Sequence, residues 1–137
     1  MQISSFQFTN PVLKHLQFKI NEGFTKSGKL DMALKVNVSC KREEPEADTS
    51  SNTAVVAVTL TLGTQDLSTP FYIEATEEAS FRWDEQITDS KQIDTLLNQN
   101  AVALLISYLR PIIANITMAS PYPAYNLPYI NLTPDAR

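Results

Sequence analysis

The side chains that could perform covalent chemistry are few in this sequence. It has one cysteine, Cys40, and one histidine, His15. A thiol beside an imidazole can act as a nucleophile with its own base, but both residues lie in strand-like segments without a recognisable motif. We therefore expect Cys40 to be a buried structural thiol, His15 to be an exposed strand residue, and no residue to be catalytic.

A group of carboxylates near the middle of the chain is the other candidate for catalysis. Two neighbouring carboxylates can divide the roles of acid and base. At strand and turn spacing, however, such residues are more typical of a solvated rim, which is the interpretation we favour. The group consists of Glu74, Glu77, Glu78, Asp84 and Glu85.

Cofactor sites are not indicated by the composition. One histidine and one cysteine cannot form a His/Cys zinc cluster within one chain. The three glycines lie outside any phosphate-binding loop pattern. A net charge of −4 argues against nucleic acid as a partner. We expect no metal, no cofactor and no nucleic acid, and the residue inventory favours a binding protein over an enzyme.

Length and composition indicate an ordinary globular domain. The chain of 137 residues with 43% hydrophobic content is long enough for one core, so we expect a single domain over 1–137. One cysteine and an N-terminus unlike a secretory signal favour the cytoplasm. No apolar run approaches the roughly 20 residues of a membrane span, so we expect no membrane insertion.

The first eighty residues alternate between apolar and polar positions, which predicts β-strands. Four segments show the pattern: 14–20, 29–40, 54–62 and 70–76. One face of each strand is apolar, so we expect a four-stranded antiparallel sheet that is solvated on its other face. The sheet should span about 4–83.

After residue 88 the period becomes helical, and we expect helices over about 89–119. Asp89 is a plausible N-cap for the first helix, and Asn100 for a longer second helix. One apolar stripe of that second helix consists of Val102, Leu105, Ile106, Leu109, Ile113 and Ile116. The expected fold is therefore α+β, with a long helix of the C-terminal half covering one face of the sheet.

A second apolar stripe occupies much of the remaining circumference of this helix. It consists of Ala101, Leu104, Tyr108, Ile112 and Met118. A helix that is apolar on two sides is buried on two sides. Either a partner subunit or the C-terminal segment could cover the second side, and we favour a partner subunit.

The stretch PYPAYNLPYINL, residues 121–132, is rich in proline and tyrosine and has no charge. Its prolines exclude a helix and favour an extended chain. Such a segment could fill the core or form a docking surface.

The order of these elements resembles that of the SecB protein-export chaperone family. The segment FQFTNPVLKHLQFKI is similar to the family's first strand with its lead-in, and VAVTLTLG followed by PFYIEA to its third and fourth strands. SYLRPIIANITMASPYPAYNLPYINL resembles the main helix and the Asn-Leu-x-Pro motif that follows it. The likeness covers nearly the whole chain in order.

This resemblance implies an ATP-independent holdase that binds unfolded polypeptides and assembles as a homotetramer, a dimer of dimers. The second helix stripe would be the oligomer interface. The client groove would be formed by strand and C-terminal residues, namely Leu30, Met32, Leu34, Val36, Tyr122, Tyr125, Leu127, Tyr129 and Ile130.

Partner docking is implied for the outer face of the sheet, at His15, Lys19, Tyr72 and Glu74. The family presents acids on its first strand to a basic tail of the SecA motor, whereas this chain has His15 and Lys19 there. Delivery to SecA is thus in doubt. The family also continues past the Asn-Leu-x-Pro motif into a further helix, while this sequence stops at TPDAR, which suggests either a truncated sequence or a more open groove.

Two alternatives to a general export chaperone stay open. One is a dedicated SecB-like chaperone that protects a single partner, such as an antitoxin. The other, from a different class, is a small-ligand carrier or enzyme, which would have a closed pocket in a monomer.

Overall fold

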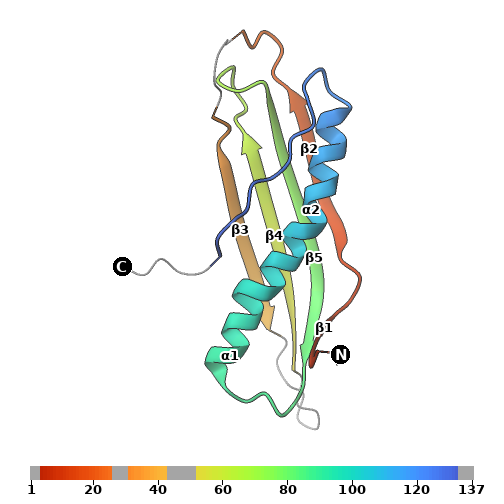
Figure 1. Cartoon of the computed structure of the whole chain (residues 1–137), viewed down its shortest axis with the longest axis vertical. Helices are drawn as coiled ribbons and strands as arrows, with labels where there is room; N and C mark the ends of the chain where they lie inside the picture. The colour runs from red at the N-terminus through yellow and green to blue at the C-terminus, as the bar shows by residue number, and fades with distance from the viewer. Residues whose placement is uncertain (1–3, 26–30, 43–51, 133–137) are drawn as a thin grey trace, which may run out of the picture.

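A computed structural model gives the structure of residues 4–25, 31–42 and 52–132. It consists of one antiparallel sheet, one long helix that crosses a face of the sheet, and a C-terminal segment beside that helix (Figure 1). The strands are β1 (Phe6–Phe8), β2 (Val12–Ile20), β3 (Leu34–Arg42), β4 (Thr53–Gly63) and β5 (Phe71–Trp83).

Strand β5 organises the sheet. It pairs with β4 along one edge, and β1 and β2 pair with successive parts of its other edge, while β3 completes the sheet beyond β4. The expected α+β fold is confirmed. The strand β1 is additional to the four that alternation predicts, because three residues are too short to show a period.

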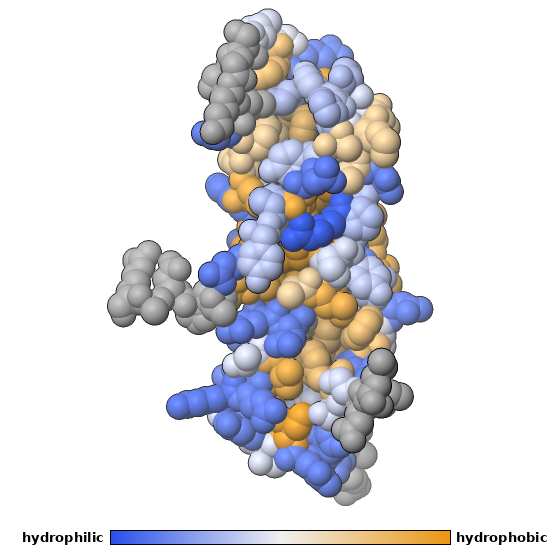
Figure 2. Space-filling model, in the orientation of Figure 1, coloured by the Kyte–Doolittle hydropathy of each residue, from blue (hydrophilic) through white to orange (hydrophobic). Residues whose placement is uncertain are grey.

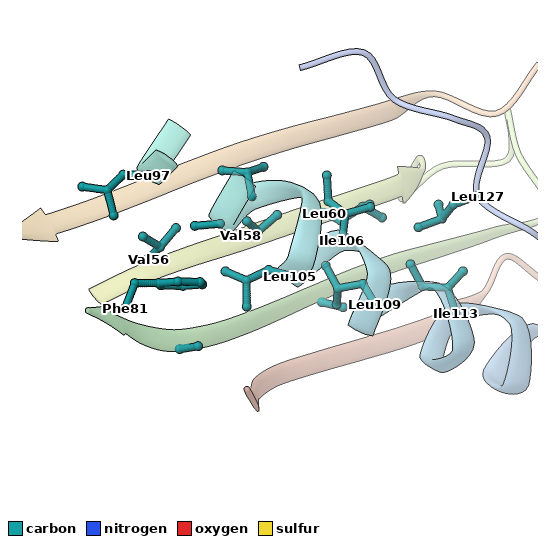
Figure 3. Close-up of a cluster of buried hydrophobic side chains, with 14 of the residues drawn as sticks. Val56, Val58, Leu60, Phe81, Leu97, Leu105, Ile106, Leu109, Ile113 and Leu127 are labelled. Atoms are coloured by element: carbon teal, nitrogen blue, oxygen red, sulfur yellow. The ribbon is translucent and has the colours of Figure 1, made fainter. Parts of the chain in front are cut away.

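The inner face of the sheet carries the core, as the alternation predicts. Val56, Val58, Leu60 and Leu62 of β4 are completely buried, and Ile73 and Ala75 of β5 join them. The helical residues Leu105, Ile106, Leu109 and Ile113 pack against this face (Figure 3). Each large apolar side chain removed from water contributes about 1.5–3 kcal/mol, so this layer dominates the stability of the domain.

The helix is continuous from residue 90 to 118. It comprises α1 (Ser90–Thr95), a π-helical turn η1 (Leu96–Asn100) and α2 (Ala101–Met118). The Asp89 carboxylate accepts a hydrogen bond from the Lys91 backbone N–H at 3.0 Å, which confirms the predicted N-cap. The predicted cap at Asn100 is wrong: its backbone is helical, because η1 leads into α2 without a break.

The same helix is long and apolar enough, by length and composition alone, to cross a membrane. Its most apolar window has a mean hydropathy of 1.6. The expectation that no apolar stretch approaches the length of a membrane span is therefore wrong for this helix, whereas the expected absence of membrane insertion stays a prediction. Here, however, one side of the helix packs on the sheet, which is the arrangement of a core helix in a globular domain.

Candidate polypeptide-binding groove

An open groove lies between α2 and the end of the C-terminal segment. Its volume is about 360 Å³. Ala103 and Ile106 line the helical side, and Tyr129, Ile130 and Leu132 line the other. The remaining lining residues are polar or charged: Gln99, Asn100, Arg110 and Asn131. Figure 2 shows this side of the molecule, where apolar residues lie between hydrophilic ones along the middle. The groove is open to solvent, unlike the closed pocket expected of a small-ligand carrier.

Arg110 attaches the C-terminal segment to the helix. Its guanidinium donates hydrogen bonds to the backbone carbonyls of Leu127 and Pro128, the second at 3.1 Å. A planar guanidinium suits two adjacent acceptors. Leu127 itself is buried in the core, next to the helical side chains (Figure 3). One wall of the groove is thus held in place by a helical side chain and a core leucine.

The start of the segment is held by Thr117. This fully buried hydroxyl donates to the Ile113 carbonyl at 2.8 Å and accepts from the Tyr125 backbone N–H at 2.7 Å. The ring of Tyr122 packs at 5.9 Å from that of Phe71. Proline prevents the segment from continuing the helix, so these contacts replace helical hydrogen bonds in fixing its path.

Replacing Thr117 with valine should destabilise the domain by about 1–3 kcal/mol, because the half-buried N–H of Tyr125 would lose its acceptor. Chemical denaturation of both proteins measures this difference. Thr95→Val, at an exposed position on α1, is the matched control and should change stability little. Equal effects at both positions would show that the Thr117 hydroxyl does not hold the segment.

The predicted groove residues fall into three classes. Tyr129 and Ile130 line the groove, and Tyr129 is 89% exposed. Leu127 is a core residue. The others in the described part are half-buried beside the core and do not line it: Met32, Leu34, Val36, Tyr122 and Tyr125. Leu30 lies outside the described residues.

Sequence reasoning missed the helical wall of the groove. Ala103, Ile106 and Arg110 lie on the flank of α2 that faces the C-terminal segment. A signal was present, because Arg110 is the only charged residue in α2. A single cation on an otherwise uncharged helix indicates a specific acceptor, here two backbone carbonyls.

The predicted interface stripe lies largely on the other flank of α2 and is not covered by the C-terminal segment. Tyr108 is 39% and Met118 is 62% exposed, while Leu104 and Ile112 are half-buried. Ala101 is completely buried within the chain, so its assignment to an interface is wrong: it belongs to the core cluster. Leu13 and Leu16, on the inner face of β2, add exposed apolar surface on the same side of the sheet.

The predicted docking residues meet on the outer face, away from α2. His15 Nε2 lies 2.9 Å from Glu74 Oε2, and Lys19 pairs in register with Tyr72. Their role in binding a partner stays a prediction.

The geometry excludes a catalytic pair of Cys40 and His15. Cys40 is exposed, not buried as expected. It lies on the opposite face from His15, with β4 and β5 between their strands. Within the residues described, no group of three potential ligands could hold a metal ion.

Glu77 does not belong to a solvated rim. It lies on the inner face of β5, is 3% exposed, and its Oε2 has no hydrogen-bond partner among the described residues. Glu74 and Glu78 lie on the outer face, so the sheet separates them from Glu77. Burial raises the pKa of Glu77 because the charged form loses hydration.

Glu77 should make stability depend on pH. Its raised pKa means that the folded chain holds the proton more tightly than the unfolded chain. The resulting stabilisation is complete below the unfolded-state pKa and is lost as the pH rises through the folded-state pKa. Glu77→Gln should therefore gain stability relative to the parent protein between about pH 4 and about pH 7. Urea denaturation at both values tests this, and Glu78→Gln on the outer face is the control. A pH-independent difference would contradict a buried, ionising Glu77.

Known proteins resemble this chain in sequence or in structure. No family model matches the chain. An uncharacterised protein of Methanocaldococcus jannaschii is 25% identical over 130 residues, which cover 93% of this chain and 80% of that protein. A protein of unknown function from Streptococcus agalactiae has a similar structure, with a TM-score of 0.59 and 10% identity over 90% of this chain and 97% of that one.

The Mycobacterium tuberculosis Rv1957 SecB-like chaperone, solved in complex with a ChAD peptide from the Rv1956 HigA1 antitoxin, is also similar. The TM-score is 0.67 at 15% identity, over 92% of this chain and 88% of that one. The two chains share an antiparallel sheet with a long helix across it, and the match covers most of both. The chain therefore has a SecB-like fold.

Proposed function

We propose that this protein is an ATP-independent chaperone that holds non-native polypeptide segments in the groove between α2 and residues 129–132. The observation that carries the proposal is this open, partly apolar groove on a fold shared with a chaperone that was solved with a bound peptide. The proposed activity needs no catalytic residue, and Cys40 and His15 lie on opposite faces of the sheet, so they cannot act as a catalytic pair.

The groove suits extended chains better than compact ligands. Tyr129 offers a flat, exposed surface with a polar tip, and Ile130 and Leu132 offer aliphatic contact. Each large client side chain taken from water would contribute about 1.5–3 kcal/mol. Several such contacts along one chain would favour the unfolded client over its compact native form, and so delay aggregation.

We further propose that the chain assembles as a homotetramer, a dimer of dimers, through the apolar flank of α2. Leu104, Tyr108, Ile112 and Met118 support this, because a monomer leaves them partly in contact with water. Assembly would place several grooves on one particle, which raises the avidity for a long client.

This function has two candidate client ranges. A chaperone dedicated to one partner is supported by the antitoxin peptide on the structural neighbour. A general export chaperone, with delivery to SecA in the cytoplasm, is the second candidate and follows from the family resemblance. Purifying the protein from its host separates them: one stoichiometric companion supports the dedicated role, and a broad mixture of precursors supports the general one.

The groove is tested by aggregation assays. The protein, without nucleotide, should suppress light scattering by heat-denatured citrate synthase. Tyr129→Ala should raise the concentration needed for suppression about tenfold or more, because it removes about 1.5–3 kcal/mol of contact from each bound segment. Leu67→Ala, in the exposed turn between β4 and β5, is the control. No suppression by the parent protein, or equal loss in both variants, would contradict the proposed groove.

A further inference from the structure

The outer face of the sheet has the opposite charge from the chain as a whole. On this face β2 to β5 present five basic side chains, Lys14, Lys19, Lys35, Lys41 and Arg82, against two carboxylates, Glu74 and Glu78. This face therefore has a formal excess of positive charge, whereas the net charge of the chain is −4.

Both carboxylates already have basic neighbours. Glu78 Oε2 lies 3.6 Å from Lys14 Nζ, and Glu74 Oε2 lies 2.9 Å from His15 Nε2. In the part of the chain that the structure describes, no salt bridge engages Lys19, Lys35 or Lys41. The positive side chains of this face thus exceed what its own acids compensate.

The charges are arranged in lines along the strands. Lys35 and Lys41 lie on the edge strand β3, and the carboxylates lie on β5. Between them β4 presents only short, uncharged side chains: Val55, Ala57, Thr59 and Thr61. Thr59 and Thr76 share a hydrogen bond of 2.7 Å, so this strip is flat and its hydroxyls are partly satisfied.

We propose that the outer face of the sheet binds an extended acidic polypeptide segment, laid along β4 beside Lys35 and Lys41. Six residues of strand separate these lysines, which is about 20 Å. A segment in an extended conformation would match them with two acidic residues at a similar separation. Charge complementarity would also orient the partner toward this face of an otherwise acidic protein.

Nucleic acid fits this surface less well. A polyphosphate chain would bring a negative charge past Glu74 and Glu78 at every nucleotide, and single strands need aromatic stacking platforms. Tyr72 is the only aromatic residue that β2 to β5 present on this face. A polypeptide can instead place its carboxylates beside the lysines and uncharged residues elsewhere.

The test is fluorescence anisotropy at low ionic strength. The probe is a labelled peptide of repeated Glu-Ser pairs; the references are the same peptide with Gln for Glu and a single-stranded DNA of equal length. The Glu peptide should bind more tightly than both references. Lys35→Glu and Lys41→Glu should each weaken its binding about threefold to tenfold, because exposed charge pairs contribute modestly.

Two further variants distinguish this surface from a general charge effect. Lys91→Glu, on α1 and away from the sheet, should leave the affinity within about twofold of the parent protein. Glu78→Gln should increase it, which no folding defect can do. Equal binding of the Gln peptide, equal loss in Lys91→Glu, or tighter binding of DNA would overturn the proposal. Tyr129→Ala should not change peptide binding, so the outcome is separate from that of the groove.

Discussion

Leu109→Ala is expected to lower the free energy of unfolding by about 2–5 kcal/mol, the range for large-to-small changes in a packed core. Leu109 is completely buried where α2 crosses the sheet, in the middle of the cluster in Figure 3. The substitution loses the free energy of transferring the rest of the isobutyl group from water to the core. It also leaves a cavity that neither the strands nor the helix can close easily. Denaturant titration with circular dichroism as the signal measures the loss.

The matched control for this prediction is Leu67→Ala. Leu67 is 59% exposed in the turn between β4 and β5, so the same substitution should cost well under the core value. A cost at Leu109 as small as at Leu67 would mean that α2 is not packed on the sheet as described. Because the groove has α2 as one wall, a large loss at Leu109 should also reduce client holding at elevated temperature.

The strands could be predicted because their inner faces obey one rule. Val56, Val58, Leu60 and Leu62 alternate with short, uncharged residues, and their burial follows from that pattern. In β5 the alternation is interrupted at Glu77, which stands on the inner face where an apolar residue would continue the pattern. The alternation therefore predicts a strand to residue 76, whereas the strand extends to Trp83 and supports β1 as well.

The groove could not be predicted to the same degree, because it depends on the path of a segment without a period. Residues 121–132 could equally have filled the core or covered the second helix stripe. Hydrogen bonds from Arg110 to two carbonyls and from Tyr125 to Thr117 select one path, along the other flank of α2. Such contacts join residues that are distant in sequence, so no local pattern specifies them.

Because the C-terminal segment follows this path, it leaves the second apolar stripe of α2 uncovered. In a monomer, Leu104, Tyr108 and Met118 are partly in contact with water. They lie beside the exposed Leu13 and Leu16 of β2, so the exposed apolar residues are grouped on one side of the subunit rather than scattered singly. The C-terminal segment lies on the opposite flank, so it does not compete for this side. In the proposed assembly, a second copy of the chain covers this side.

Leu104→Glu should therefore convert the proposed tetramer to smaller species, measured by native mass spectrometry at micromolar concentration. A carboxylate buried in an apolar interface without a partner costs several kcal/mol per subunit, roughly a thousandfold or more in each association constant. Tyr108→Glu, at a more exposed position of the same flank, should have the same effect with less disturbance of the subunit.

The control for assembly is Gln92→Glu, which adds the same charge at an exposed position of α1. It should leave the tetramer intact. A tetramer that survives both Leu104→Glu and Tyr108→Glu would remove this flank of α2 from the interface, and a parent protein that is monomeric would remove the assembly itself. If the variants instead become monomers that still bind a client segment, each subunit carries a complete groove, and assembly acts only through avidity.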